Sequence, residues 1–201
     1  MELRLRNIKT AFFNIKDLHI ASGERLLIKG PSGTGKTTLL HLLAGLYLPS
    51  SGEVLWDKTD ISTLSENQVS HFRKSKMSLI FQNLNLLPYL TALENIELGG
   101  ASGQLAQEKL NQVGLAEKSV ARTQSLSLGE QQRVAVARSL AQSQEVLLAD
   151  EPTSSLDDVN AEQVTNLLFN GSSKQSIIMV SHDHRVEKFF TRIVDMKEIM
   201  A

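Results

Sequence analysis

Residues 30–38 are the part of this chain whose types and spacing are best suited to chemistry. They are, in order, Gly30, Pro31, Ser32, Gly33, Thr34, Gly35, Lys36, Thr37 and Thr38, and they fit the pattern G-x-x-x-x-G-K-[ST]. The glycines let backbone N–H groups turn inward around a phosphate, and the positive end of a following helix adds its partial charge. Lys36 supplies a point charge for β- and γ-phosphates, and the Thr37 hydroxyl is a hard oxygen of the kind that Mg2+ binds. The pattern therefore predicts a phosphate-binding loop with an adjacent Mg2+ site.

Two flanking segments supply the strand and the helix that such a loop requires. Residues 25–29 form an apolar, strand-like run that enters the loop, and residues 37–44 form the helix that leaves it. Residues 3–8 and 17–20 predict two short strands ahead of the loop, and residues 53–56 predict another after it. We therefore expect a small antiparallel sheet near the start of the chain.

The rest of the chain alternates helix-like and strand-like segments. The expected elements are a helix over residues 65–73, a strand over 77–81, short helices over 93–98 and 105–113, a helix that Ser127 caps with Glu130 three residues on, a strand over 146–149, a helix over 158–169, a strand over 176–180, and a helix with one or two short strands between 185 and 200. The last two strands before the tail are continuously apolar, which is typical of buried parallel strands. Residues 83 to about 121 read as a helical subdomain inserted between two halves of an α/β core.

Composition limits the classes of protein to which the chain can belong. Its 201 residues are 41% apolar, and 21 basic residues face 22 acidic ones for a net charge of −1. This balance gives no overall basic field for nucleic acid, so we expect no nucleic-acid partner. The absence of cysteine excludes disulfides and thiolate metal sites. No apolar run approaches the roughly 18 to 20 residues that span a bilayer, so any membrane role is expected to come through a partner.

Residues 83–92 are unusually apolar for a loop and are interrupted by a proline. Their apolar side chains are Leu84, Leu86, Leu87, Tyr89 and Leu90. These side chains either pack inward as the core of the helical subdomain or line an exposed groove that receives a short helix of a membrane partner. As a third possibility, some of these side chains pack inward and others line the groove.

Taken together, the motifs resemble those of the nucleotide-binding subunit of ATP-binding cassette (ABC) transporters, in the order of that family and over nearly the whole chain. The matching segments are the Walker A loop at residues 30–37, the Q-loop at Gln82, the signature at residues 126–131, the Walker B strand at residues 146–150, the catalytic glutamate at Glu151, the D-loop at residues 155–157 and the switch histidine at His182. The sequences of residues 81–83 and 129–133 resemble those of the branch of lipoprotein-release and macrolide-export ATPases.

The resemblance implies a role for each catalytic and metal-binding residue. Asp150 holds the water shell of Mg2+ opposite Thr37, and Glu151 orients or polarises the attacking water as a general base. Gln82 reaches Mg2+ or that water and then releases it. His182 bonds the γ-phosphate and so senses whether the triphosphate of ATP is present.

The resemblance also implies that two copies of the chain form a head-to-tail, ATP-dependent homodimer. In that dimer Ser127 and Gly129 present a hydroxyl and a backbone N–H to the nucleotide bound by the other copy. The signature departs from the commonest form of the family by having Leu128 and Glu130 in place of a glycine and a glutamine. Leu128 weakens dimer closure if its position demands a positive φ and has a mild effect if it is helical; we expect it to be helical.

The aromatic residue that stacks on adenine in this family aligns best with Phe12. From the sequence alone, Phe12 or Phe13 is either such a stacking ring or a core side chain at a sheet edge. The segment between Phe12 and Leu18 is shorter than is usual in the family, so selectivity for adenine stays open.

These observations predict an α/β fold with a P-loop NTPase core, in which a mostly parallel sheet is flanked by helices, together with an antiparallel β subdomain and an inserted α-helical subdomain. We expect a single ABC ATPase domain over residues 1–201. It is expected to hydrolyse ATP with Mg2+ and to drive integral membrane permease subunits from the cytoplasm, as a peripheral protein on the inner face of the membrane. The alternative is an ABC ATPase that moves no substrate and acts in cell-division signalling or cofactor assembly. Cargo and direction are properties of membrane subunits.

Overall fold

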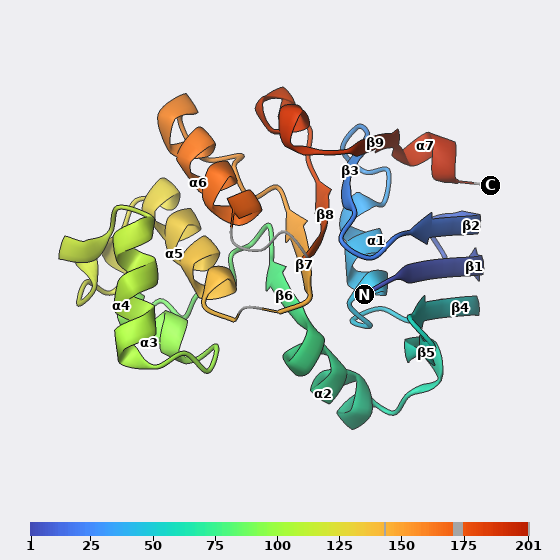
Figure 1. Ribbon diagram of the computed structural model, residues 1–201, viewed down its shortest axis with the longest axis horizontal. Helices are drawn as coiled ribbons and strands as arrows, with labels where there is room; N and C mark the ends of the chain where they lie inside the picture. The colour runs from blue at the N-terminus through green and yellow to red at the C-terminus, as the bar shows by residue number, and fades with distance from the viewer. Residues whose placement is uncertain (143, 171–174, 201) are drawn as a thin grey trace. The chain divides into compact units, whose positions relative to one another are not determined.

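The computed structural model describes residues 1–142, 144–170 and 175–200 of the chain. The chain divides into two compact units, each built from separate stretches of sequence. The first unit comprises Met1–Ser78, Gln144–Asp150 and Lys174–Ala201, and the second comprises Leu79–Ser143 and Glu151–Ser173. Figure 1 shows their helices and strands in chain order by colour.

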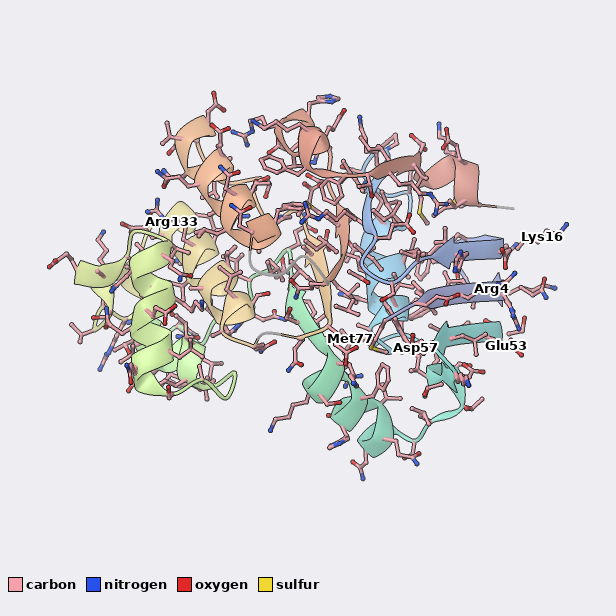
Figure 2. The ribbon with its side chains drawn as sticks, viewed as in Figure 1. Arg4, Lys16, Glu53, Asp57, Met77 and Arg133 are labelled. Carbon is pink, nitrogen blue, oxygen red and sulfur yellow. The ribbon has the colours of Figure 1, made fainter. Side chains whose placement is uncertain are left out.

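An antiparallel sheet in the first unit has the strand order β2-β1-β4-β5. Its strands are β1 (Leu3–Lys9), β2 (Asn14–Ile20), β4 (Ser51–Trp56) and β5 (Thr59–Asp60). Buried and exposed residues alternate at the start of β1, as the period of two of a half-buried strand requires. Figure 2 shows Arg4, Lys16 and Glu53 pointing away from the strands that carry them.

The second sheet has the order β6-β7-β8-β3-β9. Its strands are β6 (Met77–Ile80), β7 (Val146–Asp150), β8 (Ser176–Val180), β3 (Arg25–Lys29) and β9 (Arg192–Asp195). The pairs β7/β8, β8/β3 and β3/β9 are parallel. Every residue of β7 and β8 is buried, because strands of a covered parallel sheet have no solvent face.

Among the described residues of the first unit there are four helical segments besides a short 3-10 turn, η1 (Ile61–Thr63). They are α1 (Lys36–Leu43), α2 (Glu66–Lys76), the 3-10 helix η4 (His184–Phe189) and α7 (Met196–Ile199). Helix α1 packs against β7 and β8. Two side chains donate to carbonyl oxygens at its C-terminal end: the Trp56 indole N–H donates to Leu43 at 2.9 Å, and Arg73 Nη1 donates to Gly45, two residues past the helix, at 3.1 Å.

Helices α3 (Ala92–Glu97), α4 (Gly103–Gln112) and α5 (Leu128–Leu140) pack against one another in the second unit, and α6 (Asp158–Asn170) packs against α5. Two 3-10 turns, η2 (Ala116–Lys118) and η3 (Thr123–Ser125), connect α4 to α5. Capping boxes open α3 at Thr91 and α5 at Ser127. These caps satisfy N–H groups that would otherwise lack acceptors.

The expected fold class is confirmed, since a parallel sheet with helices, an antiparallel sheet and a helical region are all present. Strand β2 starts three residues before the expected position, because its pairing with β1 continues to the end of the hairpin, where Asn14 faces Lys9. Strand β5 has only two residues and was not predicted. Residues 83–121 contain α3 and α4, while a single domain with that insertion stays a prediction.

Within the described ranges, no helix combines the length and apolarity that crossing a membrane requires.

Candidate functional site

Parallel pairing in the first unit brings three predicted segments to one edge of the sheet. Ile28 near the end of β3 and Asp150 at the end of β7 both pair with Val180, the last residue of β8. Gly30 follows Ile28 by two residues, and His182 follows Val180 by two. The loop, the acidic residue and the histidine therefore begin at the same level, at the carboxyl edge where open α/β sheets bind ligands.

The loop over residues 30–38 depends on glycine at its second turn. Gly33 and Gly35 have φ values of 81° and 90°, in the left-handed region that glycine adopts without strain. A Cβ atom on Gly35 would also lie 2.9 Å from the Phe13 ring. Gly35 is thus required both by its backbone conformation and by the space that Phe13 occupies.

Lys36 is buried and folds back over the loop that precedes it. Its Nζ donates to the carbonyl oxygen of Gly30 at 2.6 Å and to that of Pro31 at 2.9 Å, and the Thr34 hydroxyl donates to Pro31 at 2.8 Å. Because α1 begins at Lys36, the N–H groups of its first turn have no acceptor within the helix. The loop thus offers an ammonium group and backbone donors to an anion. Of its other residues, Pro31, Ser32 and Gly33 are exposed, and Thr37 and Thr38 are half-buried.

The oxygen donors of the first unit fit Mg2+ bound together with a phosphorylated ligand. Thr37 provides a hydroxyl on α1, and Asp150, a residue that is 5% exposed, provides a carboxylate at the end of β7. In residues 1–142, 144–170 and 175–200, no three His, Cys, Asp or Glu side chains form a cluster able to hold a metal ion. Mg2+ in proteins commonly uses one or two protein oxygens and takes its other ligands from phosphates and water.

His182 is exposed and lies two residues beyond β8. The helical turn η4 that follows it is hydrogen-bonded to β3, the strand that enters the loop. Lys29 Nζ donates to Glu187 Oε1 on η4 at 2.6 Å, and His184 Nδ1 lies 2.6 Å from the same oxygen. The Lys29 hydrogen bond is the main cause that lowers the pKa of Glu187, and His184 adds to it. His184 is exposed.

Phe12 and Phe13 have different environments at the tip of the β1–β2 hairpin. Phe12 is 67% exposed and its ring centroid lies 6.2 Å from that of Tyr47, whereas Phe13 is 6% exposed and contacts the loop at Gly35. Phe13 is therefore a core residue that shapes the loop. Phe12 has the solvent exposure that a base-stacking ring requires, and its stacking role stays a prediction.

The second unit places the expected signature residues at the start of α5. Ser127 is the N-cap, and its hydroxyl accepts a hydrogen bond from the Glu130 N–H at 3.3 Å. Leu128 is the first helical residue and has no positive φ, so the expectation that it is helical is confirmed. Gly129 lies in the same first turn, and a Cβ atom there would lie 3.4 Å from the carbonyl oxygen of Ser155. Lys118 binds Glu130 and lowers the pKa of that carboxyl.

Gln82 and the apolar residues after it also belong to the second unit. Gln82 is exposed, two residues beyond β6. Leu84 is buried, Leu86, Leu87 and Leu90 are half-buried, and Tyr89 is 62% exposed. The buried Asn95 accepts from the Leu87 N–H at 2.8 Å and donates to the Leu87 carbonyl at 3.1 Å, which fixes the middle of the segment. The segment therefore has an inward subset and an outward aromatic residue.

Arg138, on the last turns of α5, was not predicted as a functional or structural residue. Leu84 and Asn85 are consecutive residues with φ values of 57° and 48°, and their carbonyl oxygens accept hydrogen bonds from Arg138 at 2.7 and 2.8 Å. Burial lowers the pKa of the Arg138 guanidinium from its ordinary value. This residue offsets the strain of two left-handed residues, each of which costs roughly 1–2 kcal/mol.

Glu151 is buried and also adopts a left-handed backbone conformation, with φ 48°. Its carbonyl oxygen accepts hydrogen bonds from the Ser154 hydroxyl at 3.1 Å and from Gln132 Nε2 at 2.9 Å. Gln132 lies on α5, so the turn that carries Glu151 is attached to the helix that Ser127 caps. Sequence reasoning missed Gln132 because it resembles any other polar residue of a helix.

A second connection joins α5 to the start of α6. Arg133, labelled in Figure 2, donates from Nη1 to Asn160 Oδ1, while its buried Nε has no hydrogen-bond partner. The Asn160 N–H and its side-chain amide donate to the two carboxylate oxygens of Asp157 at 2.9 and 2.6 Å. The backbone hydrogen bond from Asn160 is the first cause that lowers the pKa of Asp157. Asp157 thus serves as the N-terminal cap of α6.

Comparison with known proteins gives a consistent result. A family model described as "ABC transporter" matches residues 13–154. A lipoprotein-releasing system ATP-binding protein, LolD, of Legionella pneumophila (strain Paris) is 40% identical over 192 residues, which cover 90% of this chain and 85% of the relative. An uncharacterized ABC transporter ATP-binding protein, Rv0073, of Mycobacterium tuberculosis is 39% identical over 189 residues. The match covers 90% of this chain and 57% of that relative, so the chain spans little more than half of that protein's length.

Solved structures agree with the sequence relatives. The dimeric, post-hydrolysis structure of the ATP-binding cassette MJ0796 bound to ADP and Pi has a TM-score of 0.86 and 34% sequence identity, covering 96% of this chain and 93% of that one. A second dimeric structure of MJ0796 has a TM-score of 0.88 over the same coverage.

The arginine clamp on Leu84 and Asn85 generates a prediction about stability. Replacing Arg138 with methionine keeps most of the apolar stem but removes both hydrogen bonds, and it is expected to lower the free energy of unfolding by about 1–3 kcal/mol. Urea unfolding followed by circular dichroism measures this change, and amide exchange should accelerate within residues 83–90. The control is Arg122→Met at an exposed arginine of the same unit. Equal effects of the two substitutions would contradict the clamp.

Proposed function

Because the chain belongs to the ABC transporter family, we propose that it is the ATP-binding and ATP-hydrolysing subunit of a transporter. One observation carries this proposal: the glycine loop, Asp150 and His182 all start at the same carboxyl edge of a parallel sheet, as the pairing of β3, β7 and β8 dictates. ATP is the ligand that matches the loop, and Mg2+ is the ion that matches Thr37 and Asp150.

Binding and hydrolysis use different side chains. Lys36 and the N–H groups of the loop bind the β- and γ-phosphates. Thr37 and Asp150 would hold Mg2+, and Gln82 would be a further ligand. When bound, Mg2+ neutralises charge that develops on the phosphate oxygens. Glu151 accepts a proton from the attacking water, and His182 contacts the γ-phosphate. Phe12 stacks on the adenine ring from the exposed tip of its hairpin.

The proposed active form is a head-to-tail homodimer with two shared sites. Ser127 and Gly129 lie at the N-terminal end of α5, where a hydroxyl and a backbone N–H are available to an anion. In each site the loop comes from one copy and this helix end from the other. The dimeric MJ0796 structures, one of them bound to ADP and Pi, support this arrangement. ATP joins the two copies, and hydrolysis releases them.

We further propose that the dimer works on integral membrane permease subunits from the cytoplasmic face of the membrane. The exposed Tyr89 follows Gln82 by seven residues, in a segment anchored on the inside by Leu84 and Asn95. A movement of Gln82 on nucleotide binding is thereby passed to a surface that a short helix of a permease can contact. Affinity purification from membranes tests this directly: a polytopic membrane protein should co-purify, whereas none is expected for a non-transport ABC ATPase.

Glu151→Gln should bind MgATP and stop before hydrolysis, because an amide can orient water but cannot accept its proton. ATP-dependent dimers should accumulate, as measured by size-exclusion chromatography with light scattering, and kcat should fall by about 100-fold or more. Wild-type turnover in this variant would remove Glu151 from the catalytic role.

Ser127→Arg should leave ATP binding to the monomer intact and prevent closure of the dimer, because Ser127 meets nucleotide only across the interface. Lys36→Ala should abolish tight ATP binding, which calorimetry measures. A mixture of the two variants can form a heterodimer with one intact site and one doubly defective site. Recovery of ATPase activity in that mixture is expected, and normal hydrolysis by purified Ser127→Arg would disprove the shared site.

Tyr89→Glu should abolish co-purification of the permease and its stimulation of hydrolysis, while basal ATPase activity survives. The reason is that a charge replaces an apolar ring on the proposed contact surface. Tyr89→Phe is the matched control and should retain both properties. If a folded Tyr89→Glu variant still binds and responds to the permease, the surface lies elsewhere.

A further inference from the structure

The side-chain amide of Gln132 is buried against the turn that carries Glu151, yet the proposed reaction gives this amide no role. It is 2% exposed on α5, Nε2 donates to the Glu151 carbonyl at 2.9 Å, and Oε1 accepts from the Ser155 N–H at 3.1 Å. A donor faces an acceptor at one end and an acceptor faces a donor at the other, so its two partners define the orientation of the amide. Gln132 therefore binds both ends of the turn from Glu151 to Ser155.

The turn itself needs such support. Glu151 has a φ of 48°, a conformation that costs a non-glycine residue roughly 1–2 kcal/mol and persists only where its surroundings hold it. Thr153, at the centre of the turn, is completely buried, and the Leu156 N–H closes on its carbonyl oxygen at 3.1 Å. The turn therefore has hydrogen bonds within itself, and the contacts of Gln132 additionally attach it to α5.

The neighbouring glutamine shows that the contact is specific to position 132. Gln131 is half-buried, and its Nε2 donates to the carbonyl oxygen of Leu126, just before the start of the same helix. Gln131 therefore stays within its own segment. Gln132 instead reaches a turn that begins 19 residues later in the chain.

We propose that Gln132 is a positioning residue that couples the helix end carrying Ser127 to the catalytic Glu151 of the same chain; this inference rests on the proposed function. Through the Glu151 carbonyl, Gln132 sets the backbone orientation that aims the Glu151 carboxylate. Through the Ser155 N–H, it keeps the far end of the turn on α5. The helix that contacts the partner's nucleotide and the base that acts on the chain's own nucleotide thereby move together. Each of the two sites can in this way influence hydrolysis at the other.

Two substitutions separate the two ends of the contact. Gln132→Met keeps the length of the side chain and removes both hydrogen bonds. Gln132→Glu keeps an acceptor for the Ser155 N–H but places an oxygen against the Glu151 carbonyl. Gln131→Met is the matched control on the same helix. Amide exchange at Ser155 should rise in Gln132→Met and stay at the wild-type level in both Gln132→Glu and the control.

Both Gln132 variants should lower kcat for MgATP hydrolysis at least tenfold and leave KM and the ATP affinity of the monomer within twofold. A general loss of structure would change the affinity as well. The decisive measurement is a double-mutant cycle with Glu151→Gln, using single-turnover hydrolysis followed over hours. If Gln132 acts through Glu151, Gln132→Met should cause little or no further loss in the Glu151→Gln background.

The outcomes distinguish this inference from the function on which it rests. Equal fold-losses in both backgrounds, or wild-type kcat in Gln132→Met, would overturn the positioning role. An unchanged amide exchange rate at Ser155 in Gln132→Met would show that the hydrogen bond between Ser155 and Gln132 does not protect this amide. This measurement does not depend on catalysis. An absence of ATP hydrolysis by the wild-type dimer, with Ser155 exchange responding as expected, would instead disprove the proposed function.

Discussion

In-register pairing of parallel strands is the constraint on which the first unit depends. Strands β3, β7 and β8 are consecutive neighbours in the sheet but come from widely separated parts of the chain, and Ile28 and Asp150 both pair with Val180. A parallel ladder places the carboxyl ends of its strands at one edge. A shift of one strand by a residue would turn its apolar side chains to the opposite face and displace the loop, the carboxylate or the histidine that follows it. The buried apolar residues of these strands thus determine where polar chemistry occurs.

Helix α5 is the corresponding organiser of the second unit. Its N-terminal end carries Ser127 and Gly129, its middle holds the turn at Glu151 through Gln132, and its last turn holds Leu84 and Asn85 through Arg138. Each attachment is made by a polar side chain to a backbone group. Such bonds are directional and costly to leave unpaired in a buried setting, so they specify one arrangement more strongly than apolar packing does.

Much of this structure could be predicted from the sequence because its signals are local. The glycine and lysine spacing of the loop, the apolar runs of β7 and β8, and the cap formed by Ser127 with Glu130 all depend on residues close together in the chain. The same cap places Leu128 at the first position of the helix, as expected. Strand ends were less predictable, since β2 is extended by its partner strand rather than by its own residues.

The contacts that the sequence did not reveal join residues far apart in the chain. Gln131 and Gln132 are the same residue type in neighbouring positions, and only the fold shows that one of them reaches Glu151. Leucine at position 84 gives no sign of a left-handed backbone, because the stabilising Arg138 is 54 residues away. Phe12 and Phe13 likewise differ only in the direction that the hairpin gives them, outward for one and toward Gly35 for the other.

The two hydrogen bonds of Lys36 to its own loop have a consequence for the thermodynamics of binding. An ammonium group has three N–H donors, and here two of them already point to the carbonyl oxygens of Gly30 and Pro31. Tetrahedral geometry then fixes the direction of the third. Ordering a free lysine side chain costs up to about 2 kcal/mol in rotamer entropy, and in this chain much of that cost belongs to folding rather than to ligand capture. The ammonium group of Lys36 is therefore already oriented when the ligand arrives. This preorganisation arises from hydrogen bonds within the loop and not from contacts with the ligand.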